Sequence, residues 1–458
     1  MTNYIRSYWT QRAAKAALIT SIALSLAASD ARGTTRYWQG TAGNNWSTPA
    51  NWSPTGPPQN ADDLVFANRV SYNIVNDLPS LKVRSLDFQL SFTVSGNSLA
   101  IENSISSEAT DSSVSLDVSG LTLLGNISIS CDSQDLYFNC PIDLVDYDII
   151  AYTHNNRYLW FASTLSGTGE FAAAGGNIFL YPFNGNPFAG TFVVQNATLY
   201  LDSLNGGSVR TRLEIWFGGT VSLSKSFQID GGVPVVFMEA TAQLLLNGNT
   251  NWFSDVEMRG GLLDSGPAGM SYLAGELQAT SGYSQVAGNL SLYDAATPPA
   301  EFSVTSSSNP ALDLAANVSG TDLTKTGSGF MRLLGNNTFT GNLQIDAGTV
   351  QPTSAAALSP SSAGVILNGG NLQMQGLTIG NEPLYVNSPN STLIAYDACS
   401  WSGSVTLNAD FNVLPADTTS TGKAMNFTGP ISGSGGVTML DSPSYNGTLL
   451  LSGSSANT

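Results

Sequence analysis

The chain has 458 residues, with 16 Lys or Arg, 33 Asp or Glu and a single His, and its formal charge is −17. Only 11% of the residues are charged, whereas about a quarter is usual in a globular domain. The 42% hydrophobic content argues against disorder, and the acidic balance argues against nucleic-acid and anionic-lipid partners. The lone His154 excludes a two-His metal site, and no C-x-x-C pair supports a zinc ribbon. The sequence therefore predicts no metal and no cofactor.

Residues 1–31 are typical of a secretory signal peptide. Three cations precede an apolar stretch from Ala16 to Ala28, and small residues follow, so cleavage is expected near Ala28 or Ala31. A membrane anchor is the alternative, but the apolar stretch is shorter than the roughly 20 residues of a spanning helix. Removing three cations and one anion changes the charge from −17 to −19.

Residues 32–70 are predicted to form an N-terminal capping module. Trp38, Trp46 and Trp52 lie close together and alternate with asparagines. Flat aromatic rings beside amide groups can bind sugars, which makes these three tryptophans candidate glycan-binding residues. The favoured interpretation is that they cover the open end of the core.

Residues 71–458 read as short strands throughout. Apolar residues alternate with small polar ones, as in Val114, Leu116 and Val118, and Gly, Asn, Ser and Pro interrupt the pattern every ten or so residues. Two all-β architectures fit, a set of sandwiches or one solenoid. Low charge, internal repetition and the lack of a linker beyond residue 70 favour a solenoid of roughly 17–21 turns.

Cys131 and Cys140 are predicted to be buried thiols. Cys131 and Cys140 are each in phase with apolar neighbours, and a bridge between them remains open because sequence does not reveal its geometry. Cys399 has no evident partner.

Two carboxylates are the candidate catalytic residues. Asp146 and Asp148 are two residues apart, so on a strand they share one face at about 7 Å between Cα atoms. That spacing suits acid–base catalysis or calcium binding, but two solvent-facing acids explain it equally well. Asp62 and Asp63 are expected to be turn or cap residues, and His154 a loop residue. No nucleophile elbow, P-loop or dinucleotide fingerprint occurs.

Three stretches repeat a common pattern. They are "LSGTGEFAAAGGNIFLYPFNGNPFAGTFVVQNATLYL" (165–201), "VSGTDLTKTGSGFMRLLGNNTFTGNLQIDAGTV" (318–350) and "ISGSGGVTMLDSPSYNGTLLLSGSSANT" (431–458). Each begins with an aliphatic residue, Ser-Gly and a small residue. Two continue with Asn, an aromatic residue and Gly at alternate positions: Asn186, Phe188 and Gly190, and Asn337, Phe339 and Gly341. We expect the asparagines to link neighbouring turns, the rings to fill the core, and the glycines to allow close approach.

Residues 323–350 resemble the autotransporter-associated β-strand repeat, also called the passenger-associated transport repeat, of Gram-negative bacteria. Residues 37–66 resemble the Trp- and Asn-rich module that often precedes such repeats. The resemblance implies a right-handed parallel β-helix and a role in the folding and display of exported passengers. It supplies no catalytic residues.

The chain stops at "LLLSGSSANT", inside a repeat, whereas the family's products commonly end in an outer-membrane barrel or a sorting tail. We therefore expect a fragment or a truncated product, with such an anchor beyond Thr458. The expected protein is a non-enzymatic, secreted or cell-surface, outer-membrane-associated passenger for display, adhesion or cell-envelope interaction. Its expected partners are surface glycans or the surfaces of host or neighbouring cells. The alternative is a carbohydrate-active or glycan-binding β-helix protein.

Overall fold

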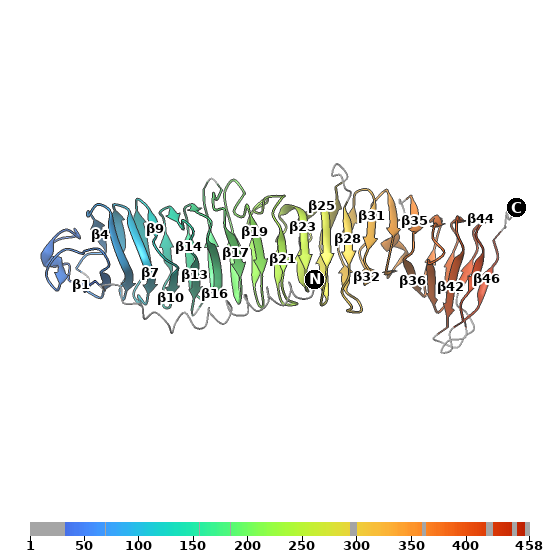
Figure 1. Ribbon diagram of the computed structural model, residues 1–458, viewed down its shortest axis with the longest axis horizontal. Coiled ribbons are helices and arrows are strands. Elements are labelled where there is room, and N and C mark those ends of the chain that lie inside the picture. The colour runs from blue at the N-terminus through green and yellow to red at the C-terminus, as the bar shows by residue number, and fades with distance from the viewer. Residues whose placement is uncertain are drawn as a thin grey trace.

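The alternating segments form short strands that stack into a long rod (Figure 1). The computed structural model describes residues 33–453, apart from residues 69, 155, 184, 294–299, 360–362, 418–424 and 442–446. The predicted signal peptide, residues 1–31, lies outside the described residues. We call each complete turn of the solenoid a rung. Each rung places strands on two or three faces, and strands on one face pair in parallel with those of the next rung.

The first face carries one continuous series of parallel strands, in which each strand pairs with the next one named. The series is β1 (Thr35–Trp38), β3 (Asp63–Phe66), β5 (Leu81–Phe88), β7 (Leu99–Ser107), β10 (Ile127–Cys131), β13 (Ile149–Thr153), β16 (Glu170–Leu180), β17 (Thr191–Val194), β19 (Arg212–Ile215), β21 (Val235–Phe237), β23 (Thr250–Met258), β25 (Met270–Ala279), β28 (Glu301–Val304), β31 (Leu323–Thr326), β33 (Asn342–Ile345), β35 (Gly364–Leu367), β38 (Leu384–Val386), β41 (Val405–Leu407) and β44 (Ile431–Gly433).

The second face carries a similar series, to which the end of β16 also contributes. The series is β4 (Asn73–Asn76), β6 (Thr93–Gly96), β8 (Val114–Val118), β11 (Leu136–Phe138), β14 (Tyr158–Phe161), β18 (Ala197–Leu201), β20 (Thr220–Leu223), β22 (Gln243–Leu245), β24 (Gly261–Asp264), β26 (Ser284–Ala287), β29 (Leu312–Leu314), β32 (Phe330–Leu333), β34 (Thr349–Pro352), β36 (Asn371–Gln375), β39 (Thr392–Tyr396), β42 (Phe411–Ala416) and β45 (Val437–Met439).

Shorter strands complete some of the rungs. They are β9 (Leu121–Leu123), β12 (Ile142–Asp143), β15 (Leu165–Ser166), β27 (Asn289–Leu292), β30 (Asn317–Ser319), β37 (Thr378–Ile379), β40 (Cys399–Trp401), β43 (Met425–Phe427) and β46 (Leu449–Leu451). At the N-terminal end, β2 (Trp52–Ser53) pairs antiparallel with β1. Two single-turn 3-10 helices, η1 (Pro49–Asn51) and η2 (Ala355–Leu358), lie in corners.

One hydrophobic core runs along the axis of the rod. Alternate residues of each strand point inward, so Val114, Leu116 and Val118 of β8 are buried while the residues between them are not. Parallel, in-register pairing places like side chains above one another, as in the stacked rings of Phe138 and Phe161, whose centroids are 5.0 Å apart. The buried cluster extends without interruption from the first rung to the last ones.

The predicted all-β parallel solenoid is confirmed, and it has about 17 turns, at the lower end of the expected range. In the described part of the chain, the only helical segments are the two short ones, and none is long and apolar enough to cross a membrane. The fold therefore presents a long outer surface made of strands and corners, on which any site must be built.

Candidate functional site

The three tryptophans that were candidates for sugar binding lie inside the N-terminal end of the core. Trp38, Trp46 and Trp52 are at most 2% exposed. Ring centroids are 5.1 Å apart for Trp38 and Trp52, 5.9 Å for Trp46 and Trp52, and 5.6 Å for Trp46 and Phe66. Rings packed in this way offer no face to a sugar. The geometry favours the capping role.

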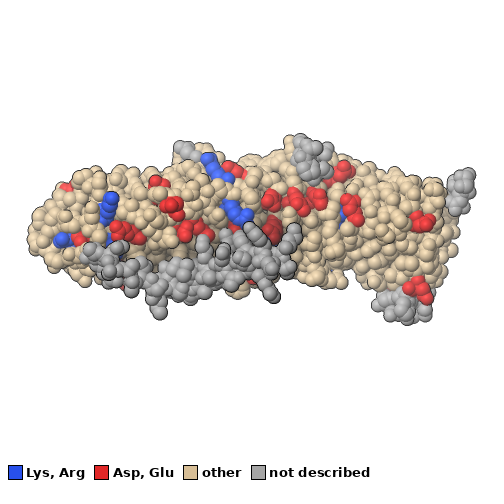
Figure 2. Space-filling view, in the orientation of Figure 1, with Lys and Arg blue, Asp and Glu red and all other residues tan. Residues whose placement is uncertain are grey.

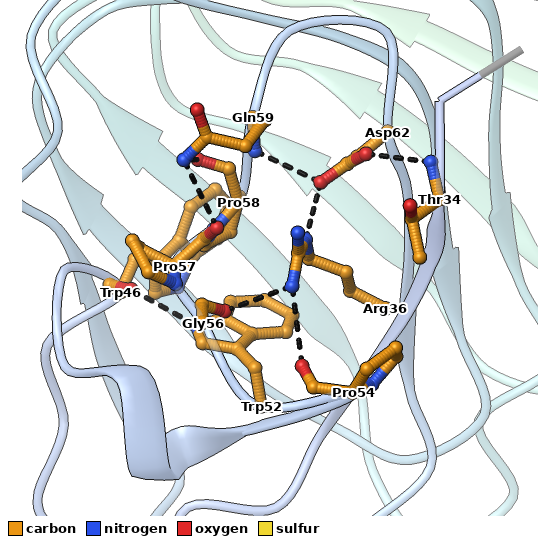
Figure 3. A network of polar contacts seen from close by, with 10 residues as sticks. All are labelled: Thr34, Arg36, Trp46, Trp52, Pro54, Gly56, Pro57, Pro58, Gln59 and Asp62. Carbon is orange, nitrogen blue, oxygen red and sulfur yellow. Dashed lines mark hydrogen bonds and ion pairs between the residues drawn. The ribbon is translucent and has the colours of Figure 1, made fainter.

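A polar network ties the two ends of this module together (Figure 3). Arg36 forms an ion pair with Asp62, and its guanidinium also donates to the carbonyl oxygens at both ends of segment 54–56, each at 3.1 Å. The Asp62 carboxylate accepts the backbone N–H groups of Thr34 at 2.7 Å and Gln59 at 2.8 Å. Asp62 is 2% exposed. The carboxylate is therefore a cap for this corner, as expected from its position.

Asp146 and Asp148 do not share the face of a strand. Both lie in the corner between β12 and β13, where Val145 has a left-handed backbone with φ of 57°. Asp146 is exposed, whereas the Asp148 carboxylate accepts the backbone N–H of Glu170 in the next rung at 2.8 Å. The strand placement assumed for this pair is wrong, because the bend at Val145 breaks the two-residue period. In the described residues, no group of three or more His, Cys, Asp and Glu side chains is placed to hold a metal ion.

All three cysteines are buried free thiols, which confirms the interpretation favoured from the sequence for Cys131 and Cys140. Burial, together with nearby carboxylates, raises the pKa of Cys131 to about 12 and that of Cys140 to about 12. Burial also raises the pKa of Cys399. A thiol with such a pKa stays protonated at neutral pH and is a poor nucleophile. None of the three is placed for covalent catalysis.

His154 lies in a corner, as expected. Its Nε2 atom is 3.7 Å from a carboxylate oxygen of Asp132, and both side chains are well exposed. Its ring also packs edge-on against Tyr152, with centroids 5.5 Å apart. These contacts belong to a surface corner and not to an enclosed catalytic centre.

The repeated asparagines each link three consecutive rungs. The side-chain oxygen of Asn337 accepts a hydrogen bond from the Val318 N–H at 2.8 Å, and its side-chain NH₂ group donates one to the Ala357 carbonyl at 2.6 Å. Asn186 repeats this pattern, because its side chain bonds the Leu165 N–H at 2.9 Å and the Ser208 carbonyl at 3.2 Å. Both side chains are buried. The predicted inter-rung role of these asparagines is confirmed, and it explains why they must be asparagines, which carry both a donor and an acceptor.

The aromatic and glycine positions of the pattern also have clear roles. Phe188 and Phe339 are buried in the core at 1% and 0% exposure. A Cβ atom at Gly190 would lie 1.8 Å from the carbonyl oxygen of Gly169 in the preceding rung. Only glycine lets the two backbones approach so closely. The pattern therefore marks a tight corner of the solenoid.

Lys325 is a buried structural residue of this repeat that sequence reasoning missed. It lies on β31 in the inward phase and is 0% exposed. Its ammonium group donates to the carbonyl oxygens of Thr326, Gly327 and Ala347 at 2.8, 2.6 and 2.9 Å. Burial lowers the pKa of Lys325 from 10.5 to about 8. The sequence signal for this buried lysine was its place two residues after Leu323, where the period-two alternation calls for an apolar residue.

Charge is spread along the outer surface (Figure 2). Acidic side chains occur singly or in small groups along the face shown, and several basic side chains pair with acids. Such pairs are Arg84 with Asp63, Arg212 with Glu214, Lys225 with Asp202, Arg259 with Glu257, and Arg332 with Asp313. On the face shown, the basic side chains form no dense patch of the kind that phosphate groups require.

Comparison with protein families places the repeat within a known group. The model of the Passenger-associated-transport-repeat matches residues 323–351, which run from the start of β31 into β34. No curated protein and no solved structure gave a significant match. The match covers the segment with Lys325, Asn337 and Phe339, and the solenoid fold agrees with a passenger repeat. The chain is therefore a parallel β-solenoid that carries a passenger-associated transport repeat, a repeat typical of autotransporter passengers.

Proposed function

We propose that this protein is an exported passenger displayed at the cell surface, where the rod serves as a non-enzymatic stalk for adhesion or cell-envelope interaction. The observation that carries the proposal is the passenger-associated transport repeat at residues 323–351. This repeat is an integral part of the solenoid, because β31 and β33 pair with strands of the rungs before and after it. Repeats of this kind are typical of autotransporter passengers.

The shape of the fold supports a role as a stalk. Each rung contacts its neighbours through parallel pairing, so the molecule extends along one axis (Figure 1). Buried thiols and a neutral polar surface suit an oxidising environment outside the cytoplasm, because no exposed cysteine occurs in the described residues. A rod of this kind places whatever it carries at a distance from its point of attachment.

Export is tested by the fate of the N-terminus. The full chain is expressed in a Gram-negative host, and the periplasmic protein is identified by N-terminal sequencing. We expect the mature protein to begin at Ser29 or Arg32, because cleavage is predicted after Ala28 or Ala31.

A matched pair of variants shows whether the apolar stretch drives export. Leu24→Arg combined with Leu26→Arg interrupts the stretch and should leave an uncleaved chain in the cytoplasm. Leu24→Ile combined with Leu26→Ile keeps the stretch apolar and should be processed normally. A wild-type chain that keeps Met1 and stays in the cytoplasm would contradict the proposal.

A further inference from the structure

Aromatic side chains line up on the outer surface in the middle of the rod. Trp252 of β23 is the in-register partner of Tyr272 of β25, and their rings stack with centroids 4.5 Å apart at 12°. Tyr293, just after β27, meets the Trp252 ring edge-on at 4.7 Å and 80°. Tyr293 is 41% exposed. These rings form an aromatic surface outside the hydrophobic core.

One face of the Trp252 ring is left open by the rung before it. Phe227 donates its backbone N–H to the carbonyl of Thr250, so segment 227–231 lies against the start of β23. Gly231 brings no side chain to cover the ring. The result is a hollow of about 420 Å³ whose lining includes Phe227, Asp230, Gly231, Trp252 and Tyr293. This volume falls in the range of small-molecule sites, about 300–1,000 Å³.

Another outward-facing tryptophan shows that such rings can be covered in this fold. Trp160 of β14 has Tyr137 on one side at 5.8 Å and 10°, and Phe179 on the other at 4.0 Å and 14°. Its two faces are thus occupied by neighbouring rungs. The open face of Trp252 is a local property of its surroundings, and Trp160 is a matched control for it.

The backbone of Phe227 has a left-handed conformation, which is unfavourable for a bulky residue. Its φ is 58°, and its side chain is 52% exposed. In the preceding rung Gly207 has φ of 63°, and its N–H donates to the Phe227 carbonyl at 2.8 Å. The equivalent position one rung earlier therefore has the same left-handed backbone, and there it is occupied by glycine. A bulky residue in this region costs about 1 kcal/mol or more, and strained residues of this kind cluster at binding sites. The ring of Phe227 forms one wall of the hollow.

Asp230 is the charged residue in the lining of the hollow, and Arg210 lies next to it. The Arg210 guanidinium is 3.7 Å from the Asp230 carboxylate, and both side chains are about half exposed. The pair offers hydrogen-bond donors and acceptors beside the aromatic floor, and its charges offset each other. An apolar floor with a neutralised polar rim matches a ligand that has one apolar face and hydroxyl groups at its edge.

We propose that this hollow binds a neutral pyranose sugar. The apolar face of the sugar ring stacks on Trp252, between Phe227 and Tyr293, and its hydroxyl groups bond the Asp230 carboxylate and the Arg210 guanidinium. The charge of −17 disfavours polyanionic glycans. This inference does not depend on export, because it concerns the folded rod alone.

The test measures sugar binding to the purified protein. Methyl glycosides of glucose, galactose, mannose and N-acetylglucosamine, and short oligosaccharides of each, are titrated while tryptophan fluorescence and heat are recorded. We expect saturable binding of at least one of them. Trp252→Ala should weaken it about tenfold or more, the size of a lost aromatic stacking contact, whereas Trp160→Ala should leave the affinity unchanged.

Two further variants separate binding from folding. Phe227→Gly should weaken binding while the thermal midpoint stays equal or rises, because glycine relieves the strained backbone. Gly231→Leu should block the hollow, because its side chain would lie beside Trp252. The fold should tolerate the change, because a Cβ atom at this position would make an ordinary contact of 3.4 Å with the Trp252 Cβ. The proposal is overturned if no sugar of the panel binds, or if Trp252→Ala and Gly231→Leu bind as the wild-type protein does.

Discussion

The ammonium group of Lys325 donates a hydrogen bond of 2.9 Å to the carbonyl oxygen of Ala347, in the next rung of the solenoid. The same group bonds two carbonyls of its own corner, at Thr326 and Gly327. A single side chain thus satisfies three backbone acceptors inside the passenger-associated repeat. This arrangement makes a buried cation a structural part of the corner.

Replacing this lysine should weaken the repeat. Lys325→Met fills similar volume but leaves three carbonyls without their donor, so we expect a loss of about 3 kcal/mol in the free energy of unfolding. Chemical denaturation checks this, with hydrogen exchange reporting on the neighbouring rungs. Lys82→Met, at an exposed position, is the control and should change stability by less than about 0.5 kcal/mol.

The same lysine should give the protein a distinct pH dependence. Its folded pKa of about 8 lies below the ordinary value of 10.5, so between these values the unfolded chain binds more protons than the folded one. The contribution of Lys325 to the free energy of unfolding should therefore rise from pH 8 to pH 10.5, by up to about 3 kcal/mol. Because the buried cysteines titrate in the same range in both proteins, the rise should appear as a pH-dependent difference between the free energies of unfolding of the wild-type protein and the Lys325→Met variant. Equal pH profiles of the two proteins would contradict this.

The asparagine that links three rungs should be similarly sensitive. Asn337→Ala removes the acceptor of the Val318 N–H and the donor to the Ala357 carbonyl. We expect destabilisation of about 2–4 kcal/mol, because two buried backbone groups lose their partners. Hydrogen exchange at the Val318 amide provides a direct measurement. The neighbouring Asn336 is exposed, and Asn336→Ala should leave that amide protected.

The N-terminal cap should depend on its tryptophans for stability and not for binding. Trp46 is fully buried against Trp52 and Phe66, so Trp46→Ala should cost about 3–5 kcal/mol. Thermal unfolding followed by circular dichroism measures this loss. Sugar affinity at the Trp252 hollow should remain unchanged in the variant. Unchanged stability together with lost sugar binding would instead restore the stacking role of the cap.

The two corner carboxylates should behave differently from each other and neither should be catalytic. Asp148→Ala removes the acceptor of the Glu170 N–H and should cost about 1 kcal/mol. Asp146 is exposed, so Asp146→Ala should stay within about 0.5 kcal/mol of the wild-type protein. Reducing-sugar assays with polysaccharides are expected to show no turnover. If the wild-type protein turned over a polysaccharide and Asp146→Ala abolished this activity, the non-enzymatic interpretation would be wrong.

The thiols should react only after unfolding. Because the pKa of Cys131 and of Cys140 is about 12, the thiolate that attacks iodoacetamide is scarce at pH 8, and both sulfurs are buried. Mass spectrometry should show no alkylation of the folded protein and three modified cysteines in denaturant. Rapid alkylation of the native chain, or a bridged peptide containing Cys131 and Cys140, would contradict this.

Period-two alternation in the sequence predicted short strands, the low charge and the internal repetition favoured a solenoid over sandwiches, and the resemblance to passenger repeats implied parallel strands. Most inward positions are apolar, and this leaves a readable pattern, as in Val114, Leu116 and Val118. The roles of Asn337 and Phe339 were also readable, because each depends on one residue type at one place in a repeated corner. The burial of Cys131 and Cys140 followed from the same phase of alternation.

Which outer residues become neighbours depended on the tertiary structure, because the number of residues per rung varies. Arg84 meets Asp63 across 21 residues, whereas Tyr283 meets Asp313 across 30, although both pairs join adjacent rungs. The corner lengths and bends that set the number of residues per rung follow no fixed period. One such bend, at Val145, places Asp146 in a corner and not on a strand. The sequence by itself determined the solenoid and its core. Only the folded rod decided that Trp252 lies beside Tyr293 with one face open, because that contact depends on where each corner returns the chain.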